Sequence, residues 1–244
     1  MNLIPEGDKD DGEYGQSQRG NAAMVDFERA RKMMVENQLR TSNITDKRVL
    51  AAMLQVPRER FVPEGRKALA YIDEAHRLDT ASGAARYLPS AAPFGRMVQL
   101  AGIETSDAVL DLGCGSGYST AVLSILAATV VGVDSDPQLA ALALRNSQEL
   151  GLVNVSIVAG PTENGAKSKA PFDVIMLEGA VDRVPAVLFA QLRDGGRLVA
   201  LIRNGATAVA HLFVKSGKDV ASRAEFNASL PPLTDETPAP EFVF

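Results

Sequence analysis

The chain has 244 residues, of which 46% are hydrophobic and 23% charged, a composition typical of a folded globular protein. Its 25 basic and 30 acidic residues give a net charge of −5, so the basic excess that accompanies nucleic-acid binding is absent. One cysteine and two histidines exclude an internal disulfide, disfavour a Cys/His metal site and favour a reducing compartment. No apolar stretch approaches the ~20 residues of a membrane span, and the N-terminus lacks a signal-peptide pattern. We therefore expect a cytoplasmic protein with no metal and with no nucleic-acid or membrane partner.

The two ends of the chain differ in composition from its centre. Residues 1–23 are acidic and glycine-containing without apolar periodicity, which predicts a disordered leader. Residues 231–244 form a Pro-rich acidic tail. Between these ends we predict an N-terminal helical extension over 24–100 and a ligand-binding domain over 101–230.

The extension is predicted to be mainly helical. Residues 29–39 suit one helix, and Thr45 is a plausible N-cap for a second helix that Pro57 stops. A loop-like stretch follows as far as Pro93, and residues 97–100 close a further helix.

From residue 108 onward, strand and helix patterns alternate. Strands are predicted at 109–112, 129–133, 155–158, 173–177 and 197–202, and helices at 118–126, 138–150 and 184–192. This alternation predicts a doubly wound, mostly parallel α/β sheet with helices on both faces. Two further strands, 211–215 and 225–230, have only a turn near Gly217 between them. The prediction is thus a seven-stranded, Rossmann-like sheet that ends in an antiparallel hairpin.

A glycine-rich turn follows the first parallel strand, in the segment V-L-D-L-G-C-G-S-G-Y at 109–118. Ligands bind at this end of α/β sheets, and Gly113, Gly115 and Gly117 allow close approach to the backbone. The G-x-G-x-G spacing differs from the G-x-G-x-x-G of pyrophosphate-binding turns. A turn that only connects strand to helix, or one that binds NAD or FAD, remains an alternative.

Two acids accompany the turn. Asp111 precedes the glycines, where it would repel phosphates but attract a cationic amino-acid group. Asp134 ends the next strand, where a carboxylate can accept hydrogen bonds from ribose hydroxyls. S-adenosylmethionine has both an adenosine and a cationic end, and the segment resembles class I S-adenosylmethionine-dependent methyltransferases.

The helical extension carries a narrower resemblance. The segments M-V-E-N-Q-L-R (34–40), I-T-D-K-R-V-L-A-A-M (44–53) and V-P-R-E-R-F-V-P (56–63) are similar to the opening of the protein-L-isoaspartate O-methyltransferase family. Later segments continue this similarity to about residue 203, among them P-F-D-V-I at 171–175. The resemblance implies a protein-repair enzyme that methylates the carboxylate of isoaspartyl residues in damaged proteins. Such a carboxylate is ionised at neutral pH, so catalysis requires alignment of the reactants more than a general base.

One departure from the family falls at its substrate-binding segment. Where the family has G-Q-T-I-S-Q-P, this chain has Y-L-P-S-A-A-P at 87–93. With Pro93 aligned on the family's proline, the family's serine falls on Ala91, and Ser90 lies one position earlier. Ser90 is the candidate catalytic residue that the resemblance implies.

Other departures affect the rim of the site. The family's G-D-G after the third strand reads G-P-T-E here, so Pro161 replaces the acid that the resemblance places near the adenine, and Thr162 or Glu163 could partly take its place. The stretch at 73–86 is also different and contains Arg77 and Arg86, either of which could bind a carboxylate.

The resemblance implies one cofactor site, with the turn at its centre and Glu178 at the end of a neighbouring strand. Its predicted members are Asp111, Gly113, Cys114, Gly115, Gly117, Tyr118, Asp134, Ser135, Thr162 and Glu178. Cys114 is expected only as a small turn residue, and Tyr118 suits either the cofactor or the core. Two alternative functions remain open: a methyltransferase with another acceptor, and a non-catalytic S-adenosylmethionine-binding protein.

Overall fold

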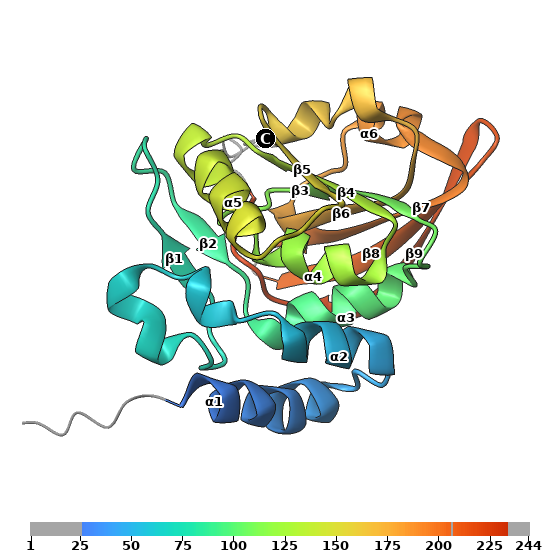
Figure 1. Cartoon of the computed structure of the whole chain (residues 1–244). Helices are drawn as coiled ribbons and strands as arrows, with labels where there is room; N and C mark the ends of the chain where they lie inside the picture. The colour runs from blue at the N-terminus through green and yellow to red at the C-terminus, as the bar shows by residue number, and fades with distance from the viewer. Residues whose placement is uncertain (1–25, 206, 234–244) are drawn as a thin grey trace, which may run out of the picture.

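The computed structural model describes residues 26–205 and 207–233, and its centre is one seven-stranded sheet (Figure 1). The strands are β3 (Ala108–Leu112), β4 (Thr129–Asp134), β5 (Val155–Ala159), β6 (Phe172–Val181), β7 (Leu192–Asn204), β8 (Thr207–Ser216) and β9 (Asp219–Ala228). Their order is β5-β4-β3-β6-β7-β8-β9, with β3 to β7 parallel and β8 and β9 antiparallel. The predicted seven-stranded sheet with its terminal hairpin is confirmed, although the hairpin strands are longer than predicted.

Helices cover both faces of this sheet because alternate strand residues point to opposite sides. One core contains Val109, Val130 and Val174 together with residues of α3 (Ala91–Ala101), α4 (Tyr118–Leu126) and α5 (Pro137–Glu149). The second core contains the neighbouring Leu110, Val131 and Ile175, packed with Leu188 of the short α6 (Ala186–Ala190). β9 forms one edge of the sheet and is mostly exposed.

The N-terminal helices pack on the α3–α4 face. They are α1 (Phe27–Met34), a π-helical turn η1 (Val35–Leu39), a 3₁₀ turn η2 (Arg40–Ser42) and α2 (Lys47–Gln55). The predicted N-cap Thr45 is wrong by one residue, because the Asp46 carboxylate accepts the Arg48 N–H at 2.8 Å. The Thr45 N–H instead donates to Gln99 Oε1 at 2.7 Å, which ties this turn to α3.

The stretch predicted as a loop contains regular structure. It holds the 3₁₀ turns η3 (Arg58–Arg60) and η4 (Glu64–Leu69), and an antiparallel pair of strands, β1 (His76–Leu78) and β2 (Arg86–Leu88). Each strand has only three residues, too few for a period-2 pattern to be recognised. The first and third residues of both strands are buried, so one face of the hairpin is directed into the protein.

After β9 the chain returns to the centre of the sheet. The Ala180 N–H at the end of β6 donates to the Pro231 carbonyl at 3.0 Å, and the Leu233 N–H donates to the Ala180 carbonyl at 2.9 Å. Leu230 and Leu233 are consequently buried. The predicted leader and most of the tail, with Phe242 and Phe244, lie outside the described residues.

Helices that could cross a bilayer are absent from residues 26–205 and 207–233, because none there is both long and apolar enough.

Candidate active site at the glycine turn

The turn between β3 and α4 has the left-handed backbone that its glycines permit. Gly113, Gly115 and Gly117 have φ values of 82°, 55° and 94°, a region that other residues enter only at a cost. A Cβ on Gly117 would lie 3.1 Å from the backbone of Ala143 in α5. The glycines therefore serve both the turn and the close packing of α4 against α5.

Asp111 lies at the end of β3, completely buried. Its Oδ2 accepts hydrogen bonds from Ser119 Oγ at 2.8 Å and Thr120 Oγ1 at 2.6 Å, both in the first turn of α4. Its Oδ1 has no hydrogen-bond partner among the described residues. Burial raises the pKa of the Asp111 carboxyl to about 6.

Glu178, near the end of the adjacent strand β6, is 5% exposed, and neither carboxyl oxygen has a hydrogen-bond donor among the described residues. Burial and the neighbouring charge of Asp111 raise the pKa of Glu178 well above its usual value. Two buried acids with unsatisfied oxygens favour a cationic group beside them.

Asp134 ends β4 and is also fully buried. Its carboxylate accepts the Gly115 N–H at 2.8 Å and the Asp136 N–H at 3.0 Å. Arg86 from β2 donates to the same carboxylate through Nη2 at 2.7 Å and to Ser135 Oγ through Nη1 at 3.2 Å. Desolvation raises the pKa of Asp134, and the Arg86 charge opposes that rise.

Two predicted residues inside the turn segment face the protein interior. Tyr118 packs its ring against Phe61 and Phe94, with centroids at 5.6 Å and 5.8 Å, and the Arg58 guanidinium lies 4.8 Å from its centre. Cys114 is 3% exposed. Burial is the main cause that raises the pKa of its thiol, and the negative charges of Asp111 and Asp134 raise it further. The structure thus places Tyr118 in the core and a protonated thiol at position 114.

Ser90 and Thr162 lie in the flanking segments. Ser90 precedes α3, and its side chain makes no capping hydrogen bond. Thr162 is buried at the start of the 3₁₀ turn η5 (Thr162–Asn164), which precedes a second 3₁₀ turn η6 (Lys167–Lys169). The Gly160 N–H donates to the Asp134 carbonyl at 2.9 Å and holds this loop beside β4.

Three hydrophobic and charged contacts at the turn were not predicted. A Cβ on Gly113 would lie 2.2 Å from Leu233 Cδ1 and 3.3 Å from Arg86 Nη2, and one on Gly115 would lie 2.9 Å from Leu78 Cδ1. All three neighbours come from segments distant in sequence, for which no local pattern gives a signal. The Ser119–Thr120 pair does carry a signal, since hydroxyls in the first turn of a helix can reach an acid at the preceding strand.

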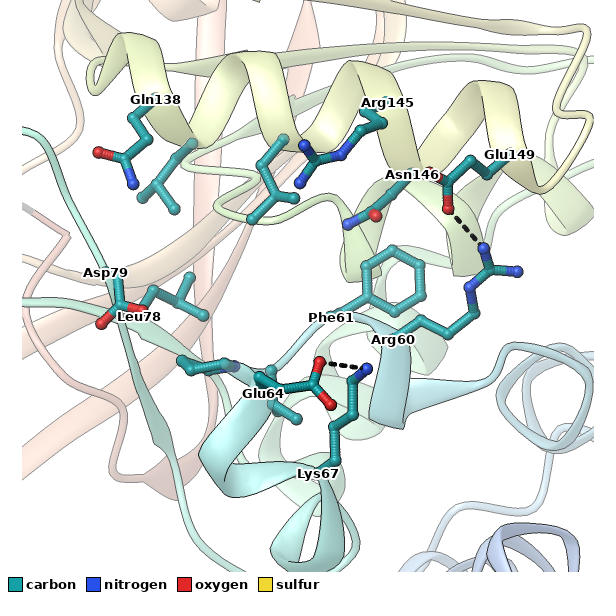
Figure 2. Close-up of a pocket in the computed structure, with 14 residues that line it drawn as sticks. Arg60, Phe61, Glu64, Lys67, Leu78, Asp79, Gln138, Arg145, Asn146 and Glu149 are labelled. Carbon is teal, nitrogen blue, oxygen red and sulfur yellow. Dashed lines mark hydrogen bonds and ion pairs between the residues drawn. The ribbon is translucent and has the colours of Figure 1, made fainter.

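A cleft of about 430 Å³ opens beside this site, between α5 and the segment that includes η4 (Figure 2). Figure 2 shows two ion pairs among its lining residues: Arg60–Glu149, at 2.6 Å, joins η3 to α5, and Lys67–Glu64, at 2.5 Å, lies within η4. Leu78 lines the cleft, and its Cδ1 lies 2.9 Å from the position that a Cβ on Gly115 would take, so the cleft adjoins the glycine turn. The other lining residues are Phe61, Val62, Pro63, Asp79, Gln138, Leu139, Leu142, Arg145 and Asn146.

The sheet order, the glycine turn and the acids at the ends of β3 and β4 define a class I methyltransferase fold. A solved protein-L-isoaspartate O-methyltransferase has the same fold, with a TM-score of 0.74 and 25% identity over 83% of this chain and 65% of that one, slightly less than two thirds of its length. A second, from Plasmodium falciparum, was solved with S-adenosyl-L-homocysteine and has a TM-score of 0.70 at 22% identity, covering 84% of this chain and 99% of that one.

Sequence relatives give the family. The model of the protein-L-isoaspartate(D-aspartate) O-methyltransferase family matches residues 29–237. A protein-L-isoaspartate O-methyltransferase 2 from Anaeromyxobacter is 42% identical over 70% of this chain and 69% of its own. One from Koribacter versatilis is 40% identical over 72% of this chain and 78% of its own. The chain belongs to this family, which confirms the predicted resemblance.

Proposed function

We propose that the protein is an S-adenosylmethionine-dependent methyltransferase that methylates the carboxylate of isoaspartyl residues in damaged proteins. The observation that carries this proposal is the pair of buried acids, Asp111 and Glu178, whose unsatisfied oxygens adjoin a glycine turn. A cofactor with a cationic amino-acid end and a ribose suits these acids and Asp134.

The residues fit this cofactor in two places. Asp111 and Glu178 would hold its ammonium group. Gly113 and Gly115 have no Cβ, so the cofactor could approach the backbone there once the side chains of Leu233, Arg86 and Leu78 move aside. Asp134 would hold the ribose hydroxyls once Arg86 leaves it. The bound cofactor supplies the methyl group as a sulfonium.

The contribution of the protein to catalysis is binding, orientation and exclusion of water. The acceptor carboxylate is already a nucleophile at neutral pH, so no side chain must remove a proton from it. Holding two reactants in line contributes up to roughly 7–11 kcal/mol to a barrier in favourable cases. The lack of a Ser–His–Asp arrangement among the described residues is compatible with this chemistry.

A methyltransferase with another acceptor is the second candidate. The observation in its favour is Ala91, which occupies the position of the family's serine and is buried in the first turn of α3. Ser90 would then have to serve from a position that precedes the helix.

Methyl transfer from labelled S-adenosylmethionine to an isoaspartyl peptide, with the matching aspartyl peptide as control, tests the proposal. We expect base-labile label on the isoaspartyl peptide alone. Absence of label on that peptide, with S-adenosyl-L-homocysteine still bound by the protein, would contradict isoaspartyl activity and favour another acceptor. Replacing Ser90 with alanine then tests its predicted role, through a loss of kcat that leaves cofactor affinity unchanged.

A further inference from the structure

The ion pair between Arg86 and Asp134 occupies the predicted ribose-binding acid. The Arg86 side chain is 8% exposed and the Asp134 side chain 0%, so both charges are almost fully withdrawn from water. The guanidinium approaches within 2.7 Å of Asp134 Oδ2, the same oxygen that accepts the Gly115 N–H. A ribose hydroxyl and Arg86 would therefore compete for one carboxylate.

The position of Arg86 is fixed by the β1–β2 hairpin. Its pairing in register with Leu78 sets both side chains on the buried face, and both touch the glycine turn. Arg77, which precedes Leu78 and pairs with Tyr87, is exposed and donates a 3.4 Å hydrogen bond to the Gly83 carbonyl. Of the two arginines that the sequence offered as carboxylate ligands, only Arg86 lies at the site.

We propose that Arg86 binds the carboxylate of the methyl acceptor. In the free protein Asp134 holds the Arg86 guanidinium, and the cofactor's ribose displaces Arg86 from Asp134 when the cofactor binds. This inference rests on the proposed function, in which the acceptor is a carboxylate and the cofactor carries a ribose. Arg86 thus has two alternative anionic partners, one in the free protein and one in the complete complex.

The chemistry of a buried guanidinium supports the acceptor carboxylate as the partner of Arg86 in the complete complex. An arginine that loses its carboxylate in a dry site leaves an uncompensated charge, which is strongly unfavourable. Its planar donors match a carboxylate in a two-point geometry. In the free protein Arg86 Nη2 lies 3.3 Å from the position that a Cβ on Gly113 would take, so the guanidinium lies beside the turn that would carry the cofactor.

The test compares Arg86→Gln with Arg77→Gln, a matched substitution on the exposed face of the same hairpin. Two experiments are made: isothermal titration calorimetry gives the Kd of S-adenosyl-L-homocysteine, and steady-state kinetics gives the KM for an isoaspartyl peptide. In Arg86→Gln we expect the Kd to fall by about fivefold, because the ion pair no longer competes, and the KM to rise by roughly tenfold or more. Arg77→Gln should leave both within about twofold of the wild type.

Arg86→Lys provides the second variant, since it keeps the charge while losing the two-point geometry. Its KM should lie between those of the wild type and Arg86→Gln. Thermal unfolding of each variant verifies that the fold is intact.

An unchanged Kd in Arg86→Gln would overturn the competition, and a lower Kd with an unchanged KM would overturn the role in acceptor binding. Either result with an active wild-type enzyme leaves the proposed function in place. No methyl transfer by the wild type, with S-adenosyl-L-homocysteine bound, would instead contradict the proposed function itself.

Discussion

Asp111 and Glu178 place two carboxyl groups in one buried space at the ends of neighbouring strands. Asp111 pairs in register with Met176, two residues before Glu178, and the charge of Asp111 contributes to the raised pKa of Glu178. Because neither Glu178 oxygen has a donor among the described residues and burial raises the pKa of both acids, the free protein favours protonation of this pair. A cationic ligand removes this requirement, since it compensates both charges.

The stability of the free protein should therefore fall as the pH rises from about 4 through 6 and above. Both acids have raised pKa values in the folded state. The folded chain therefore binds more protons than the unfolded chain in this pH range, and its stability falls as the two carboxyl groups ionise. Glu178→Gln should flatten this dependence and raise the free energy of unfolding at pH 8, because the variant has no carboxyl group to ionise in the buried space. Urea denaturation at pH 5 and pH 8 measures both effects. Glu163→Gln, at an exposed position, is the control, and an equal gain in it would argue against the buried pair.

Cofactor binding should have the opposite pH dependence. The Asp111 pKa of about 6 means that a carboxylate able to pair with an ammonium is present only above that pH. The Kd of S-adenosyl-L-homocysteine should rise by up to about tenfold per pH unit below 6. Titration calorimetry at pH 5, 6 and 7 covers a range in which the ligand's amino group stays protonated. A Kd that is constant across this range would exclude Asp111 as the partner of the ammonium group.

Asp134→Ala should weaken S-adenosyl-L-homocysteine binding by roughly tenfold or more, because the ribose loses its acceptor. In this background Arg86→Gln should no longer improve binding, since there is no carboxylate left for which to compete. The double-mutant cycle of these two positions gives the coupling energy. Asp182→Ala, an exposed acid paired with Arg203, is the control. Unchanged affinity in Asp134→Ala would refute the ribose-binding role.

Gly113→Ala should destabilise the protein more than Gly83→Ala does. Both glycines have similar φ values, 82° and 77°, so both substitutions incur the left-handed backbone cost of roughly 1–2 kcal/mol. A Cβ at Gly83 meets nothing within 4 Å, whereas one at Gly113 lies 2.2 Å from Leu233 Cδ1. Urea denaturation should show a larger loss for Gly113→Ala, and Leu233→Ala should recover part of it. Equal losses at the two positions would mean that the Leu233 side chain moves away from the added Cβ at no cost in stability.

The parts of the fold that the sequence predicted are those with local signals. The apolar runs of β3 to β7 and the glycine turn can each be recognised within a short stretch of sequence. The carboxyl ends of parallel strands meet at one edge of the sheet, which places Asp111, Asp134 and Glu178 together. The contacts that close the turn are different in kind. Arg86 and Asp134 are 48 positions apart, and Leu233 reaches Gly113 only through its pairing with β6. The N-cap shows the same limit on a small scale. Thr45 and Asp46 are both good caps, and a distant residue, Gln99, accepts the backbone N–H groups of both.

The exposed edge strand β9 also affects how the protein behaves at high concentration. A strand at a sheet edge presents unpaired backbone groups on which another chain can add. Arg223 and Glu225 place opposite charges on this strand and pair with each other, so an approaching strand would have to desolvate or separate them. These two side chains thus oppose edge-to-edge aggregation of a long and otherwise accessible hairpin.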